Sequence, residues 1–284
     1  MKNIVIVPNL NKDMADEVTA RLIDKLHAFG FKMYSASKYA ADFLDKVETF
    51  DKFPANTDLV IVVGGDGSVL DASVDAIAAD VPLIGVNLGK VGYLSEVDPE
   101  NLDVFAELAA GNYAVAERML LSVELRKNGG VSAVTRYAVN DVVISHDSYL
   151  GIADFKIENS RGEGVIYRAD GIILSTPSGS TAYSLSAGGP VVSSDVDSIL
   201  VTPVCPHSFF NRSILFNARE KITVTNTGNS ELNVSIDGRR IAALSCAEEC
   251  TVAVADKRLK MLTFSKDNMF ATLFKKMRIM EDVK

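Results

Sequence analysis

The segment LVIVVGGDGS, residues 59–68, decides the fold of the first part of the chain, because a glycine-rich turn follows directly on an apolar run. The run Leu59 to Val63 is short and rich in β-branched residues, which predicts a buried strand. Residues 69–79 have a helix-forming composition, which predicts a helix just beyond the turn. A strand that leads through a tight turn into a helix is typical of a parallel α/β sheet.

The turn has the residue types of a phosphate site. Gly64, Gly65 and Gly67 lack the β-carbons that would keep a polyanion away from the backbone, so their N–H groups can face phosphate oxygens. The N-terminus of the following helix adds a partial positive charge. Asp66 can then hold a Mg²⁺ ion, or accept the proton of a hydroxyl that attacks a phosphoryl group. The alternative is an ordinary tight turn in which Asp66 caps the helix.

The pattern of the sequence changes once along the chain. Up to about residue 115 apolar strands alternate with helical patterns, and from Met119 onward short β-branched runs separated by turn signals take over. The first group comprises Ile4 to Val7, a helix around Asp13 to Phe29, Leu59 to Val63, a helix from Val69, Leu83 to Val86, and a helix near Pro99 to Ala110. The second group includes Leu120 to Leu125, Ala138 to Ile144, Val165 to Tyr167, Ile172 to Leu174, Ile222 to Val224, Leu232 to Ile236 and Thr251 to Val254.

These patterns predict two domains in a chain of 284 residues. The first is an α/β N-terminal domain with a Rossmann-like parallel sheet over residues 1–118, and the second is an all-β sandwich C-terminal domain over residues 119–258. We expect the last segment, residues 259–284, to pack back on the first domain, with helical spacing over residues 270–280.

Composition narrows the class of protein. Hydrophobic residues make up 48% and charged residues 23%, and no apolar stretch approaches the ~18 residues that a membrane helix needs. The first residues indicate a strand rather than a signal peptide, which predicts a cytoplasmic protein without a membrane partner. The net charge of −8 offers no general attraction to nucleic acid, and we expect no such partner.

Cysteine and histidine spacing predicts no metal site. Cys205, Cys246 and Cys250 cannot make a complete disulfide set, and the last two lack a second ligand pair. The three histidines are scattered. The sequence also lacks G-x-x-x-x-G-K-[ST], and no G-x-G-x-x-G follows a strand.

A second region rich in candidate binding residues follows the expected strand Ile172 to Leu174. Residues 175–190 combine serine and threonine hydroxyls with glycines and Tyr183, which suits a nucleoside because hydroxyls read base edges and a ring stacks on them. The alternative is a Ser/Gly-rich surface loop. The pairs Asn140-Asp141 and Asp237-Gly238 lie at strand ends, where they can bind ribose or adenine, although ordinary turn chemistry explains them equally well.

Together these motifs resemble bacterial NAD kinases. The motifs, in family order, are Gly64 to Ser68, Gly85 to Leu94, Asn140-Asp141, Asp170 to Pro190, Thr202 to Ser208, and Ile236 to Gly238. The resemblance implies a substrate site between an α/β domain and a β-sandwich, and a homo-oligomer, dimer or tetramer. It also implies transfer of a phosphoryl group from ATP, or from polyphosphate in some members, to the 2′-hydroxyl of the adenosine ribose of NAD. NAD is then a substrate, and Mg²⁺ or another divalent cation is the cofactor.

The resemblance also implies roles for single residues. Asp66 is the catalytic carboxylate, and Gly64, Gly65, Gly67 and Ser68 surround the phosphates. Asp170 faces the nicotinamide end, with Arg168 nearby, and the Cys205 to Ser208 segment reaches the site of a neighbouring subunit. The other expected contacts with the dinucleotide are Asn140, Asp141, Ser178, Thr181, Ala182, Tyr183, Ser186, Asp237 and Arg239.

The chain departs from the family pattern at four of these places. Ser68 stands where threonine is usual, Asp141 where glutamate is usual, and Arg239 where glutamine is common. Asp71 stands where the family often has a basic or polar residue, and it would repel phosphate if it pointed inward. Two other classes share the glycine turn or the pocket, namely a lipid kinase of the diacylglycerol type and a non-catalytic dinucleotide-binding module.

Overall fold

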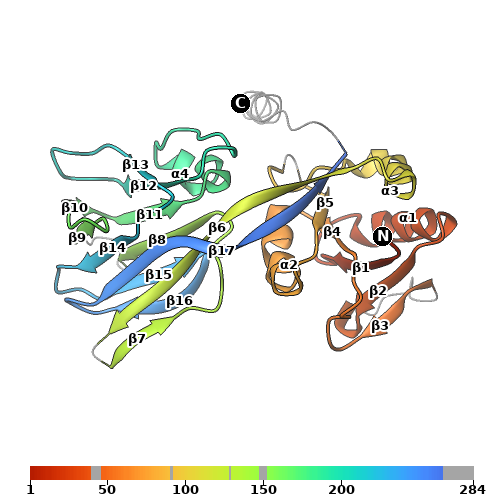
Figure 1. Ribbon diagram of the computed structural model, residues 1–284, viewed down its shortest axis with the longest axis horizontal. Coiled ribbons are helices and arrows are strands. Elements are labelled where there is room, and N and C mark those ends of the chain that lie inside the picture. The colour runs from red at the N-terminus through yellow and green to blue at the C-terminus, as the bar shows by residue number, and fades with distance from the viewer. Residues whose placement is uncertain (40–45, 90–91, 128, 147–151, 265–284) are drawn as a thin grey trace. The chain divides into compact units, whose positions relative to one another are not determined.

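The chain divides into two compact units, seen in a computed structural model that describes residues 1–39, 46–89, 92–127, 129–146 and 152–264 (Figure 1). Unit 1 comprises Met1–Glu117 and a second segment that begins at Leu259, and unit 2 comprises Arg118–Arg258. Each unit has its own hydrophobic core. The helical spacing at residues 270–280 lies outside the described residues.

Unit 1 is built on a parallel sheet. Its strands run in the order β5-β4-β1-β2-β3, and β5 also pairs in parallel with the end of β17 at Met261. The strands are β1 (Asn3–Pro8), β2 (Lys32–Ala36), β3 (Glu48–Phe50), β4 (Leu59–Gly64) and β5 (Leu83–Asn87). All six residues of β4 are buried, as expected for a strand covered on both faces.

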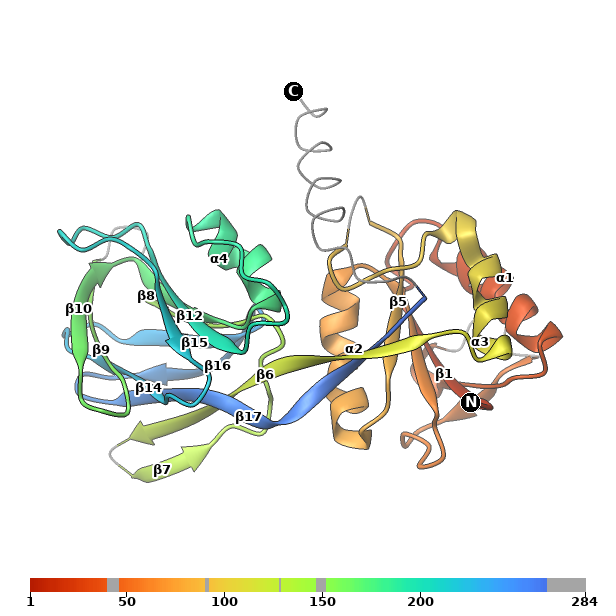
Figure 2. The ribbon, with the colours of Figure 1, turned by 45° about the horizontal axis from the view of Figure 1, so that its top comes forward.

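Helices cover both faces of this sheet (Figure 2). Helix α1 (Ala15–Ala28) and helix α3 (Ala106–Ala110) pack on one face, and helix α2 (Asp66–Ala79) packs on the other against β4 and β5. The alternation of side chains along a strand accounts for this, since Ile4, Ile6 and Ile61 share one core cluster with α1. The predicted Rossmann-like α/β fold of the first part is confirmed.

Helix α2 begins three residues earlier than predicted. We expected it from Val69, but the amides of Ser68 and Val69 already bond to the carbonyl of Gly65, which is the N-cap residue. Gly65 has an extended backbone, with φ −112° and ψ −174°, so it lies just outside the helix as its N-cap residue. Asp66 is therefore the first residue of the helix.

The predicted helix near Pro99 to Ala110 is interrupted. A 3₁₀ segment, η3 (Pro99–Phe105), contains Asn101 at the non-helical φ −113° and ψ 41°, and α3 follows it. Asp98 accepts a hydrogen bond from the amide of Glu100 at 3.0 Å, which starts η3, and Gly111 at φ 79° ends α3. A second short 3₁₀ segment, η1 (Ser37–Tyr39), follows β2.

Unit 2 is a sandwich of antiparallel strands, which confirms the predicted all-β fold. One sheet has the order β13-β12-β11-β8-β15-β16, and the other joins β10, β9 and β14 to β17, with β6 and β7 beyond. Strand β14 alternates buried and half-buried residues, so one face packs into the core. The strands are β6 (Ala114–Lys127), β7 (Gly130–Ala133), β8 (Asp141–His146), β9 (Ala153–Glu158), β10 (Gly164–Ala169), β11 (Gly171–Ser175), β12 (Ser198–Val204), β13 (Ile214–Asn217), β14 (Ile222–Asn226), β15 (Leu232–Ile236), β16 (Arg239–Leu244) and β17 (Glu249–Thr263).

The loop after β11 carries two short helical turns, η4 (Ser178–Thr181) and α4 (Tyr183–Ser186). Among the residues that the structure describes, no helix is long and apolar enough to span a bilayer.

Candidate active site

Asp66 lies at the carboxyl end of β4, where ligands bind in open parallel sheets. Gly64 is required by packing, because a β-carbon there would lie 2.5 Å from Ser68 Oγ. Gly65 and Gly67 differ, since a β-carbon at either would meet nothing within 4 Å. The backbone at these two glycines therefore has open space beside it, as a site for phosphate oxygens needs.

The Asp66 carboxylate does not cap its own helix. Its Oδ2 accepts a hydrogen bond from the Tyr93 amide at 2.8 Å. Its Oδ1 accepts from the amides of Leu94 (3.2 Å) and Ser95 (3.3 Å) and from Ser95 Oγ (3.0 Å). Helix α2 has no side-chain cap hydrogen bond. The capping alternative is therefore wrong, and segment 93–95 holds the side chain instead.

Asn9 is a neighbour of the turn that sequence reasoning missed. It follows β1, its amide bonds to the Val63 carbonyl at 2.9 Å, and its Nδ2 donates to Ser68 Oγ at 2.8 Å. Asn87 lies at the end of β5, and its Oδ1 accepts from the Gly89 amide at 3.0 Å. The sequence contained a signal for both asparagines, because polar side chains at the carboxyl ends of adjacent parallel strands gather at one edge of a sheet. Asp71 is exposed on α2.

In unit 2 the Asp237 carboxylate organises the segment around Asn140. Asp237 and Gly238, at φ 47° and φ 77°, form the turn between β15 and β16. The carboxylate accepts the amides of Val139 (2.9 Å), Asn140 (2.8 Å) and Asp141 (3.0 Å). The structure thus brings Asn140, Asp141 and Asp237 together.

Burial shifts the pKa of both acids in this cluster. Desolvation, with a smaller contribution from the charge of Asp237, raises the pKa of Asp141 to about 7. Desolvation also raises the pKa of Asp237, although its three amide donors and Arg136 act in the opposite direction. Asp141 is only 5% exposed. The aspartate that stands here in place of the usual glutamate is therefore largely removed from water.

The loop at residues 175–190 is buried in its first part and is held by defined hydrogen bonds. Thr176 donates through Oγ1 to the Val139 carbonyl at 2.7 Å, and its amide donates to the Asn140 carbonyl at 2.9 Å. A β-carbon at Gly179 would lie 1.9 Å from that same Asn140 oxygen. Ser184 Oγ is 2.9 Å from Thr202 Oγ1. Several of the hydroxyls therefore shape the loop rather than face solvent.

Tyr183, which belongs to this loop, lies near acidic groups from other segments. Its side chain is 46% exposed. Partial burial, followed by the charges of Cys205, Asp141 and Asp170, raises the pKa of its hydroxyl. The other expected contacts on the loop remain accessible, with Ser178, Thr181 and Ala182 half-buried and Ser186 exposed.

Asp170 lies beside a histidine, a neighbour that the sequence did not reveal. Its Oδ1 is 3.7 Å from His146 Nε2, and its carbonyl accepts the His146 amide at 3.3 Å. Arg168 directs both guanidinium donors to Asp154, at 2.9 and 3.0 Å, and this hydrogen bonding lowers the pKa of Asp154. Arg168 is thus occupied by another carboxylate. Arg239 is exposed at the first residue of β16.

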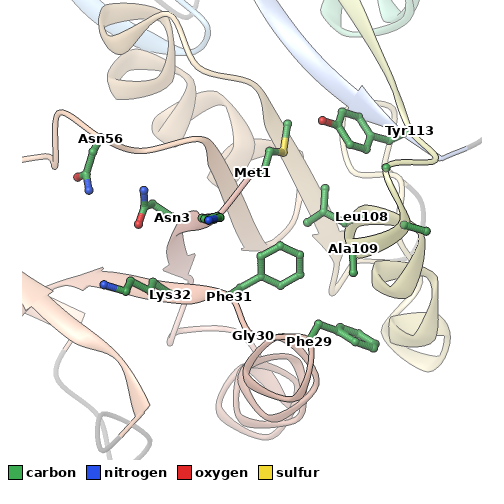
Figure 3. Close-up of a pocket in the computed structure, with 13 residues that line it drawn as sticks. Met1, Asn3, Phe29, Gly30, Phe31, Lys32, Asn56, Leu108, Ala109 and Tyr113 are labelled. Atoms are coloured by element: carbon green, nitrogen blue, oxygen red, sulfur yellow. The ribbon is translucent and has the colours of Figure 1, made fainter.

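A pocket of about 820 Å³ opens elsewhere in unit 1 (Figure 3). It lies at the amino ends of β1 and β2 and contains none of the predicted site residues. The residues around it include Met1, Phe29, Phe31, Leu108 and Tyr113. Because Asp66 is at the carboxyl end of the same sheet, this pocket is separate from the glycine-rich turn that carries Asp66.

Comparison with known proteins assigns the chain to a family. The ATP-NAD kinase N-terminal domain matches residues 4–112, and the ATP-NAD kinase C-terminal domain matches residues 139–264. The chain belongs to the NAD kinase family. The NAD kinase of Acetivibrio thermocellus is similar to it, with 34% identity over 278 residues that cover 96% of each chain. As a member of the NAD kinase family, the protein is a phosphotransferase with an alcohol acceptor, and the lipid-kinase and non-catalytic alternatives have no support.

Solved structures of NAD kinases share the fold. Yeast NADH kinase complexed with NADH has a TM-score of 0.83 at 24% identity, covering 95% of this chain and 85% of that chain. The NAD kinase from Archaeoglobus fulgidus in complex with ATP has a TM-score of 0.71 at 24% identity, covering 98% of this chain and 99% of that chain.

Proposed function

We propose that this NAD kinase family member transfers the γ-phosphoryl group of ATP to the 2′-hydroxyl of the adenosine ribose of NAD. The products are NADP and ADP. The observation that carries the proposal is the Asp66 carboxylate, which is held by defined donors beside two glycines with open space around them. The matched ATP-NAD kinase domains support the choice of donor and acceptor.

Asp66 orients the attacking hydroxyl in this proposal. The ribose oxygen forms a bond to the γ-phosphorus, the bond from phosphorus to the bridging oxygen of ADP breaks, and ADP leaves. The hydroxyl proton passes to Asp66 late, as the new P–O bond forms, since an ordinary carboxylate is a weak base for an alcohol. Oδ2 is the acceptor, because it receives one hydrogen bond while Oδ1 receives three. The amides around Gly65 and Gly67 bind phosphate oxygens.

Unit 2 binds the dinucleotide in this proposal. Asn140 and Asp141 hold ribose and adenine, and the Asp237 carboxylate fixes their backbone. Asp170 takes the nicotinamide end, with Arg168 near it. The remaining contacts in the pocket are Ser178, Thr181, Ala182, Tyr183, Ser186 and Arg239.

Magnesium is expected to arrive with the donor phosphates. Within the described part of the chain, no three His, Cys, Asp or Glu side chains form a group that could hold a metal ion. Asp66 already accepts four hydrogen bonds, and Mg²⁺ in proteins is often bound by one carboxylate together with substrate phosphates. When bound, the cation neutralises phosphate charge. Use of polyphosphate, assembly as a homo-oligomer and a cytoplasmic location remain predictions.

The proposal is tested by an assay that measures NADP formation from NAD with each phosphoryl donor. The purified chain is incubated with NAD and Mg²⁺ and with ATP or polyphosphate, and NADP is measured by an enzymatic cycling assay. We expect NADP formation with ATP and loss of activity when EDTA removes the cation. Phosphorylation of diacylglycerol without NADP formation, or NAD binding without turnover, would contradict the proposal.

A further inference from the structure

Segment 92–95 surrounds Asp66 with hydrogen-bond donors from a part of the chain 27 to 29 residues away. Three backbone amides and the hydroxyl of Ser95 converge on one carboxylate. We infer that Ser95 is a positioning residue for phosphoryl transfer, which holds the Asp66 carboxylate in the orientation that the reaction needs. The inference rests on the proposed catalytic role of Asp66.

Ser95 is itself fixed against β5. The amides of Glu96 and Val97 both donate to the Gly85 carbonyl at 3.0 Å, and the Asn87 amide donates to the Val97 carbonyl at 2.8 Å. Gly85 permits this approach, since a β-carbon there would lie 2.9 Å from Ser95 Cα. Strand β5 pairs with β4, which leads into the turn that carries Asp66. Ser95 therefore has a defined place relative to the carboxylate.

Gly92 completes the surroundings of the carboxylate. A β-carbon at this position would lie 1.9 Å from Ser95 Oγ and 2.5 Å from Asp66 Oδ1. Both distances are far below any real contact, so an alanine would displace the serine hydroxyl, the carboxylate or the segment itself. The absence of a side chain at 92 is thus a steric condition for the bond between Ser95 and Asp66.

The hydrogen bonds decide which oxygen of Asp66 is available. The χ2 torsion of aspartate is soft, so its carboxylate plane is set by its partners rather than by rotamer preference. Oδ1 receives three donors, while Oδ2 receives the Tyr93 amide and retains capacity for one more. Ser95 Oγ is the side-chain donor in this set. Its removal lets the carboxylate turn and misdirects Oδ2.

The first experiment compares three serine variants in the NADP assay. Ser95→Ala should lower kcat about tenfold to a hundredfold, as expected for loss of a hydrogen bond to a charged group, with KM for NAD and ATP within about twofold. Ser95→Thr, which keeps the hydroxyl, should restore most of kcat. Ser73→Ala is the matched control, because it removes another buried hydroxyl of unit 1, which donates to the Leu70 carbonyl within its own helix, and it should leave kcat unchanged.

A double-mutant cycle separates positioning from general damage. In the Asp66→Asn background, Ser95→Ala should change the residual rate less than about twofold, because the carboxylate that it positions is gone. The same tenfold or greater loss in both backgrounds would overturn the inference, and so would an unchanged kcat in Ser95→Ala. If Ser95→Ala does not fold, Ser95→Cys provides the same test, since a thiol donates weakly.

The two levels of the proposal fail in different ways. Near-normal turnover by Asp66→Asn would remove the catalytic role of Asp66 and with it the role of Ser95. An inactive Asp66→Asn together with a fully active Ser95→Ala would remove only the role of Ser95. Gly92→Ala should reproduce the fall in kcat, and full activity in that variant would also contradict the inference.

Discussion

At the scale of the residue, Asp66 combines a charge with a fixed orientation. Asp66→Asn keeps the size of the side chain and removes the charge that takes the hydroxyl proton in the proposed reaction. We expect kcat to fall about a hundredfold or more, the usual range for loss of a general base, while the dissociation constant for NAD changes less than about threefold. Turnover is measured as NADP formation, and binding by calorimetry. A parallel loss of binding would move Asp66 from catalysis to substrate binding.

Asp141 makes the stability of the protein depend on pH. Its pKa is raised from 3.8 to about 7, mainly by burial and then by Asp237. The folded protein therefore keeps a proton that the unfolded chain releases above pH 4. The stabilisation that this proton provides is fully present below the unfolded pKa and is lost as the pH rises through about 7.

Asp141→Asn should remove that dependence. Between pH 5 and pH 8 we expect the native free energy of unfolding to fall by about 3 kcal/mol relative to the variant, since one pKa unit corresponds to about 1.4 kcal/mol. Urea unfolding at several pH values measures the difference. Asp195→Asn, at an exposed carboxylate, is the control and should leave the pH profile unchanged. Parallel profiles for the native protein and Asp141→Asn would contradict the assignment.

At the scale of the element, the turn η4 is fitted against the backbone before β8. Gly179→Ala would place a β-carbon 1.9 Å from the Asn140 carbonyl oxygen and 2.5 Å from its carbon. Neither atom belongs to a flexible side chain, so one of the two segments must move. We expect at least tenfold weaker NAD binding and a loss of stability of about 2 kcal/mol, as for other overpacked sites.

A matched alanine at another glycine makes this prediction specific. Gly129→Ala meets nothing within 4 Å, so it should change neither binding nor the melting temperature. Calorimetry with NAD and thermal unfolding measure both quantities. Normal binding by Gly179→Ala would show that the position of Asn140 does not control the dinucleotide site.

At the scale of the whole molecule, the exposed aromatic surface between β12 and β13 bears on the predicted homo-oligomer. Phe209 is fully exposed, while Phe210 contacts the ring of Tyr167 at a centroid distance of 5.8 Å. Phe209 lies directly after the Cys205 to Ser208 segment, which the family resemblance places near a neighbouring subunit. Phe209 and Phe210 are adjacent and both exposed, and contiguous exposed apolar patches often mark protein–protein contacts.

Phe209→Ser should therefore weaken self-association. Light scattering coupled to size exclusion should give a multiple of the 30.6 kDa chain for the native protein and a smaller mass for the variant at the same concentration. Val131→Ser, at an exposed residue of β7, is the control and should leave the mass unchanged. A native protein that elutes as a monomer would contradict the predicted oligomer.

The fold and the glycine-rich turn at Gly64 to Ser68 were predictable because their signals are local. Leu59 to Val63 indicated a buried strand by composition, and Gly64 to Ser68 indicated a close backbone approach by the absence of side chains. The start of α2 was predicted at Val69, although the structure begins it at Asp66, because helical composition does not reveal which residue closes the turn. Short β-branched runs separated by turn signals, such as Ile222 to Val224, likewise indicated the sandwich.

By itself the sequence determined the two fold classes, the order of the family motifs and the residue types at each strand end, since these depend on neighbours along the chain. Only the tertiary structure decided what each polar group touches. Asp66 is held by residues 27 to 29 positions away, and Asp237 by residues 96 to 98 positions away. Such partners depend on strand register and on which glycines let two backbones approach. A local sequence pattern indicates neither of these.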